Sequence, residues 1–162
     1  MINLWQLLAH NKLTSSGDVD SGTFLTRNWL YFEFYGIANN NLQTCNLILN
    51  NDTNAEYARR RQDNGSVDTS TSDTALRGFN DKNAAGTYIF GWIMNIDGYE
   101  KLIWAERGST RTAGSGSIPD QAAVMGKYAV TSGQVTELKF IMTAGTDFAA
   151  DSELMVWGTD DN

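Results

Sequence analysis

The chain has 162 residues, of which 41% are hydrophobic and 19% charged, and its formal net charge is −7. This length predicts one domain spanning residues 1–162, which can bury roughly 70% of its unfolded surface without cross-links. One cysteine excludes a disulfide scaffold and a cysteine-based zinc site, and one histidine argues against a His-rich metal site. The acidic balance argues against nucleic acid as a partner, because phosphate contacts dominate that affinity.

The first ten residues hold no basic segment followed by a long apolar run, so no signal peptide is predicted. No stretch approaches 18 consecutive apolar residues, so no membrane partner is expected. We therefore expect synthesis in a reducing cytoplasm. Cys45 lies in an apolar stretch and is interpreted as a small core residue.

Apolar residues alternate with a period of two along most of the chain, which is typical of half-buried strands. In residues 29–36, Leu30, Phe32 and Phe34 form a wholly apolar face that is expected to point into the core. The opposite face of this strand is mainly aromatic. Further strands are expected over residues 42–49, 87–96, 101–106, 122–130, 134–143 and 152–158.

Asn, Asp and Gly residues mark the turns between these strands. Asp97-Gly98 predicts a hairpin between strands 87–96 and 101–106. Thr131-Ser132-Gly133 predicts a second hairpin, between strands 122–130 and 134–143.

Two polar stretches, residues 62–74 and 107–120, are expected to be long irregular loops. Residues 54–61 fit either a short helical turn or an edge strand. No segment predicts a helix of ten residues or more.

About eight to ten short strands without crossover helices indicate an all-β fold, an antiparallel β-sandwich or barrel. A jelly roll is the first choice. An immunoglobulin-like sandwich is the second, because the Cys-Trp-Cys pattern of that fold is absent.

No set of residues predicts catalysis or a cofactor. His10 is the only histidine, so it cannot be placed in a Ser-His-Asp arrangement, and Cys45 lacks the basic setting of a nucleophile. A glycosidase would need two opposed carboxylates in a cleft, and the sequence does not pair the glutamates that lie in or beside strands. We therefore expect a protein that is not an enzyme.

Asn50, Asp52 and Asn54 are candidates for a calcium site, because carboxylate and amide oxygens are hard ligands that suit this ion. The same residue types dominate turns for backbone reasons, and their spacing matches no EF-hand loop.

Two features are candidates for a subunit interface. Arg59, Arg60 and Arg61 form the only basic run, and arginine is favoured at protein contacts. A nucleic-acid site would require a wider basic face. The aromatic face of residues 29–36 can serve as an interface, be buried by other elements, or stack on sugar rings. Its members are Trp29, Tyr31 and Tyr35.

Three blocks, in an order and spacing that cover nearly the whole chain, carry a resemblance. The first is Leu4-Trp5-Gln6-Leu7-Leu8 with Leu13 and Ser16-Gly17-Asp18. The second is Leu49-Asn50-Asn51-Asp52-Thr53-Asn54 with Tyr57-Ala58, Arg60 and Asn64-Gly65. The third is Glu100-Lys101-Leu102, Thr112-Ala113-Gly114-Ser115-Gly116, Pro119, Gly126-Lys127-Tyr128 and Ser152-Glu153-Leu154-Met155-Val156-Trp157-Gly158. Together they resemble the small β-sandwich virion-associated proteins of tailed phages and viruses, which serve as capsid decorations or as fibre and spike components.

This resemblance implies a non-enzymatic structural role in many copies and supplies no catalytic residue. We therefore expect a viral structural protein on the virion surface, a homotrimer that also binds other capsid or fibre proteins. The alternative is a carbohydrate- or host-receptor-binding module, which requires an exposed aromatic platform or a calcium-linked polar loop. In that case a host surface glycan is the partner.

Overall fold

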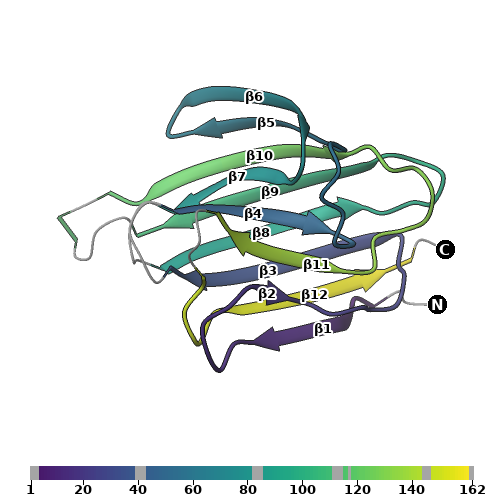
Figure 1. Cartoon of the computed structure of the whole chain (residues 1–162), viewed down its shortest axis with the longest axis horizontal. Coiled ribbons are helices and arrows are strands. Elements are labelled where there is room, and N and C mark those ends of the chain that lie inside the picture. Colours follow the sequence, from purple (N-terminus) through teal and green to yellow (C-terminus); the bar gives the residue numbers. More distant parts are fainter. Residues whose placement is uncertain are drawn as a thin grey trace.

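The computed structural model describes residues 4–38, 43–81, 86–110, 115–116, 118–143 and 147–160. These residues form an all-β fold of two antiparallel sheets, one of eight strands and one of four, arranged as a sandwich (Figure 1). The sandwich predicted from the sequence is therefore confirmed. Within the described part of the chain, no helix is long and apolar enough to cross a membrane.

The described residues contain twelve strands, somewhat more than the eight to ten expected. They are β1 (Gln6–Lys12), β2 (Val19–Asp20), β3 (Trp29–Ile37), β4 (Gln43–Leu49), β5 (Tyr57–Asp63), β6 (Ser66–Asp73), β7 (Leu76–Asp81), β8 (Gly86–Met94), β9 (Lys101–Ser109), β10 (Asp120–Tyr128), β11 (Leu138–Met142) and β12 (Glu153–Thr159).

The chain passes repeatedly from one sheet to the other. The large sheet has the order β1-β12-β3-β8-β9-β10-β5-β6, and the small sheet has the order β2-β11-β4-β7. Figure 1 shows the hairpin of β5 and β6 at one edge of the large sheet and β1 at the other.

The core lies between the two sheets and contains the apolar face predicted for residues 29–36. Leu30, Phe32 and Phe34 are fully buried. The ring of Phe34 stacks on that of Phe140 in β11, with centroids 4.1 Å apart and an angle of 13° between the planes. Each such buried side chain contributes roughly 1.5–3 kcal/mol, so contacts of this kind hold the two sheets together. Cys45 is buried in the same core, as expected.

One of the two predicted hairpins is confirmed and the other is wrong. β8 pairs with β9 across the Asp97-Gly98 turn. The hairpin predicted at Thr131-Ser132-Gly133 does not form. β10 pairs with β9 and β5 in the large sheet, whereas β11 pairs with β4 and β2 in the small sheet.

The segment between β10 and β11 crosses from one sheet to the other, and the Asn95 side chain holds it in place. The Asn95 side chain accepts a hydrogen bond from the Val135 amide at 2.6 Å and donates one to the Val135 carbonyl at 3.0 Å.

The long loop predicted over residues 62–74 is also wrong, because this stretch forms the hairpin of β5 and β6. Asn64 and Gly65 make its turn, with φ angles of 47° and 90° respectively. Asn-Gly is the strongest short-range signal for such a turn. Residues 54–61 run into β5, so the strand interpretation holds and the helical one does not. Of the second predicted loop, residues 107–109 belong to β9, and residues 111–114 and 117 lie outside the described residues.

Candidate functional site

The outer face of the large sheet carries a row of large apolar side chains that crosses six neighbouring strands. Cross-strand register places these residues side by side, and we call the row the aromatic ridge. Its members, from β1 to β10, are Leu7, Trp157, Tyr31, Trp92, Trp104 and Met125. Trp104 is 52% exposed and Met125 51%, so the ridge lies open to solvent.

The rings of the ridge support one another. The Tyr31 centroid lies 5.3 Å from that of Trp92 and 5.5 Å from that of Trp157. The Trp92 and Trp104 centroids are 5.8 Å apart. Trp5 adds an edge contact to Tyr31, with centroids 6.4 Å apart, and together with Tyr31 and Trp92 it lines a shallow hollow of about 240 Å³. Packing between rings at these distances keeps them in place while their outer surfaces stay exposed.

A glycine explains why the aromatic side of β8 faces outward. Gly91 points inward, and a Cβ atom there would lie 2.8 Å from Cζ of Phe32 and 2.6 Å from the carbonyl oxygen of Trp104. The glycine therefore makes room for the buried Phe32 ring. The larger aromatic residues of β8 occupy the opposite side, because successive side chains of a strand alternate between its two faces.

Two carboxylates accompany the aromatic rings. Glu33 and Glu106 are the cross-strand partners of Phe90, one on each side of it, on the outer face. The Tyr31 hydroxyl donates a hydrogen bond to Oε1 of Glu33 at 2.7 Å. Burial, and then this contact, raise the pKa of Tyr31 well above its ordinary value. Burial also raises the pKa of Tyr88, so both hydroxyls stay protonated and can donate hydrogen bonds.

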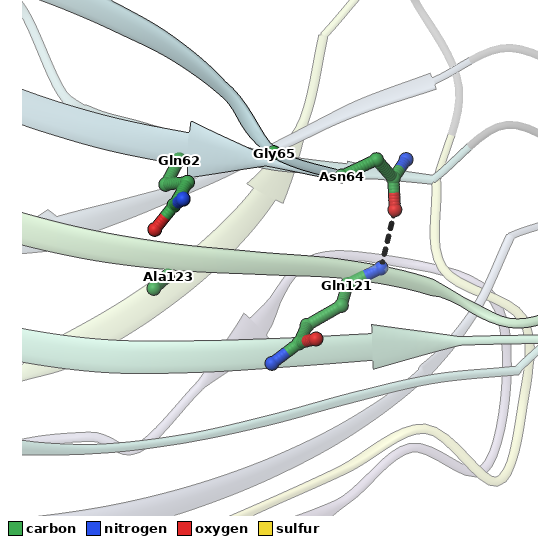
Figure 2. A pocket seen from close by; sticks show the side chains of 5 residues that line it. All are labelled: Gln62, Asn64, Gly65, Gln121 and Ala123. Atoms are coloured by element: carbon green, nitrogen blue, oxygen red, sulfur yellow. Dashed lines mark hydrogen bonds between the residues drawn. The ribbon is translucent and has the colours of Figure 1, made fainter.

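A hollow of about 220 Å³ lies at the β10 and β5 side of the same face (Figure 2). It is lined by Gln62, Asn64, Gly65, Gln121 and Ala123. Oδ1 of Asn64 accepts a hydrogen bond from the Gln121 amide at 3.1 Å, which fixes the β5–β6 turn to β10. Gln62 and Gln121 extend their carboxamides beside the small Ala123, so this hollow offers both donors and acceptors.

A second hollow of about 350 Å³ is mainly apolar. It is lined by Tyr35, Gly86, Tyr88, Gly108, Ser109, Thr110 and Pro119. Gly108 is the cross-strand partner of Gln121, so the two hollows adjoin across β9 and β10. We call their combined surface the trough. It lies beside the aromatic ridge and separate from it, because Gly108 follows Trp104 by four residues, or roughly 13 Å along β9.

The predicted interface candidates divide between the two faces of the sheet. Trp29, Tyr31 and Tyr35 share the outer face of β3, where Trp29 and Tyr31 are half-buried and Tyr35 is exposed. Arg60 also faces outward, as the cross-strand neighbour of Met125 at the end of the ridge.

Arg59 and Arg61, the two neighbours of Arg60, are not exposed on this surface, so the three arginines do not form one interface run. The alternation of β5 turns Arg59 and Arg61 inward, where their side chains are only 10% and 9% exposed. Arg59 forms an ion pair with Asp68 at 2.9 Å, and Arg61 forms one with Asp63. Of the three arginines, only Arg60 is therefore available for contacts on this surface.

The calcium candidates hold their own turn together. Asp52 accepts hydrogen bonds from the Asn54 amide at 2.9 Å and from the Tyr128 hydroxyl at 2.8 Å. Oδ1 of Asn50 accepts one from the Thr136 amide at 2.8 Å. These contacts fasten the β4–β5 turn to β10 and to the segment before β11. Among the described residues, no group of three or more His, Cys, Asp or Glu side chains is arranged to hold a metal ion.

The remaining candidates for chemistry have ordinary surroundings. His10 lies in the edge strand β1 and is partly exposed, with Nε2 2.5 Å from Oε1 of Glu153. Cys45 is buried in the core between the sheets.

The sequence reasoning did not identify Trp92, Trp104 and Met125 as surface residues. The signal that could have found them is the opposite face of β8, where Gly91 lies between Ile89 and Ile93. A small residue flanked by β-branched ones fits a crowded interior better than a row of large rings does.

No protein-family model matches this chain, and no curated protein is significantly similar to it.

Proposed function

We propose that the chain is a non-enzymatic structural subunit of a virus particle, a capsid decoration or a fibre component, that acts through protein–protein contacts. The observation that carries this proposal is the aromatic ridge. Monomeric soluble proteins rarely expose large contiguous apolar patches, and such patches commonly mark interaction sites.

The composition of the ridge favours a protein partner. Tyr, Trp and Met are enriched at the centres of protein interfaces, and charged residues are depleted there. The ridge contains no charged side chain, and charged side chains stand at its margin, among them Arg60 beside Met125 and Glu33 beside Tyr31. An apolar centre with a polar rim is the usual anatomy of such an interface.

The strand order supports the jelly-roll assignment. Four strands of the large sheet, β1-β12-β3-β8, alternate along the chain with β2-β11-β4-β7 of the small sheet. This alternation has the form of two interleaved Greek keys, to which the β5–β6 hairpin and the pair β9 and β10 are added. Jelly rolls occur in viral capsid proteins and in lectin-like domains, so the topology is compatible with a virion role.

The first partner that we propose for the ridge is another copy of this chain, in a homotrimer that in turn binds other capsid or fibre proteins. The net charge of −7 keeps the protein soluble before assembly, whereas the uncharged ridge supplies the contact. Many copies on a symmetric shell bind with high avidity even when each contact is weak.

The proposal is tested by locating the protein in purified particles and measuring its copy number, together with its molar mass in solution. We expect several symmetry-related copies with the ridge at a subunit contact. A protein that is monomeric at high concentration and absent from particles would contradict the proposal.

A further inference from the structure

The geometry points to a second binding function: the trough is a site for a neutral oligosaccharide. This inference does not depend on the virion role, since it concerns a different part of the outer face. It rests on the shape of the trough, on the kinds of polar group that line it and on its charge.

The shape comes from small residues placed among large ones. Gly108 and Ala123 lie in the middle of the outer face, with Tyr88 on one side and Gln62 on the other. A Cβ atom added at Gly108 would meet no heavy atom within 4 Å, so the surface is open at this point. From β3 to β5 the trough crosses four strand spacings, roughly 19 Å in total. This length suits a short oligosaccharide better than a single sugar.

The polar groups suit a ligand rich in hydroxyls. Gln62 and Gln121 each present a carbonyl oxygen and an amide NH₂ group, so they can both accept and donate hydrogen bonds. A sugar hydroxyl also does both. At the other end, Tyr35 and Tyr88 present exposed rings that carry hydroxyls, and an aromatic ring that is exposed beside a polar tip can stack on the apolar face of a sugar.

The charge selects against acidic ligands. None of the described lining residues is Lys or Arg. The outward-facing charges beside the trough are the carboxylates of Glu33 and Glu106 and, at its β5 end, the guanidinium of Arg60, two residues before Gln62. Glu106 lies nearest to the middle, on β9 directly opposite Ala123. An acidic group in the middle of the trough would be repelled by Glu106, whereas the two carboxylates can accept hydrogen bonds from neutral hydroxyls.

Gly108 offers a precise test, because its role is to leave space. Its backbone is outside the left-handed region and its surroundings are empty, so Gly108→Leu should fold normally while filling the trough. Gly17→Leu is the matched control, since Gly17 has the same freedom and lies away from this face, at a bridge to Phe148. Tyr88→Ala removes one ring of the platform and provides a second variant.

The experiment is isothermal titration of the full chain with neutral gluco-, xylo-, manno- and chito-oligosaccharides and with sialylated and sulfated glycans. We expect at least one neutral oligosaccharide to bind, with affinity reduced by roughly tenfold or more in Gly108→Leu and in Tyr88→Ala. Gly17→Leu should bind like the wild type, and the melting temperature of Gly108→Leu should be unchanged. Binding that survives in Gly108→Leu, a preference for the acidic glycans, or no binding of any neutral glycan would overturn the inference. Capture of a basic peptide in place of a sugar would overturn it as well.

Discussion

Nη2 of Arg107 lies 3.3 Å from Oδ1 of Asp63, inside the sandwich and on the inner face of the large sheet. The Arg107 side chain is only 1% exposed, and Asp63 also binds Arg61. One carboxylate therefore compensates two guanidinium groups that are largely removed from water. Burial lowers the pKa of Arg61, although its neighbour Asp63 opposes that shift.

Removing this carboxylate should destabilise the fold strongly. Asp63→Ala leaves two buried cations without their shared partner, and a broken buried ion pair typically costs about 3–5 kcal/mol. Denaturant unfolding measures the change in the free energy of unfolding. Glu100→Ala is the control, because Glu100 and its partner Lys127 are both exposed and the loss of this ion pair should change stability little. Equal effects of the two substitutions would contradict the compensating role of Asp63.

The inward glycine of β8 should not tolerate a side chain. In Gly91→Ala the new methyl group would overlap the backbone oxygen of Trp104 and the ring of Phe32. Overpacking of this kind costs about 1–3 kcal/mol. Gly108→Ala, on the open side of the neighbouring strand, should leave the thermal midpoint unchanged or raise it slightly. A Gly91→Ala protein as stable as the wild type would show that Phe32 does not need this space.

The turn at Asp52 should contribute stability that is lost in acid. The hydrogen bond from the Asn54 amide, followed by that from the Tyr128 hydroxyl, lowers the pKa of Asp52 in the folded protein. A lowered pKa stabilises the fold above the unfolded value of about 3.9, and this contribution disappears as the pH falls through the folded pKa.

Unfolding by denaturant at about pH 5 and about pH 3, on either side of that unfolded value, measures this contribution. The wild type should lose more stability between the two than Asp52→Asn does. Asp147→Asn, a substitution at an exposed position, should follow the wild type. A loss in Asp52→Asn as steep as in the wild type would place the acid sensitivity elsewhere.

The fold class and most strands could be read from the sequence because alternation is a local property. Residues 29–36 show this most clearly, since Leu30, Phe32 and Phe34 have no polar residue on their face. Pairing between strands is not local. Thr131-Ser132-Gly133 has the composition of a hairpin turn, yet the residues around it pass between the sheets, held by the side chain of Asn95.

Polar strands were missed for a different physical reason. β6 has one apolar residue, Val67, and lies at the sheet edge, so no buried face produces an alternating pattern. The Asn64-Gly65 turn was the only local sign of that hairpin. The inward orientation of Arg59 and Arg61 could not be read from the sequence, because it depends on the pairing of β5 with β10 and β6. The trough likewise depends on cross-strand neighbours, Gly108 and Gln121, that no local pattern relates.

The central claim, that the aromatic ridge is a subunit contact, is tested most directly by equilibrium sedimentation of the wild type and of Trp104→Arg. Trp104 is exposed in the middle of the ridge, so the substitution should preserve the fold and place a charge in the contact. Leu25→Arg is the control, because Leu25 is even more exposed but belongs to the segment between β2 and β3. We predict an oligomer for the wild type and for Leu25→Arg, and a monomer for Trp104→Arg. An oligomer of unchanged mass in Trp104→Arg, or a wild type that stays monomeric at high concentration, would contradict this account.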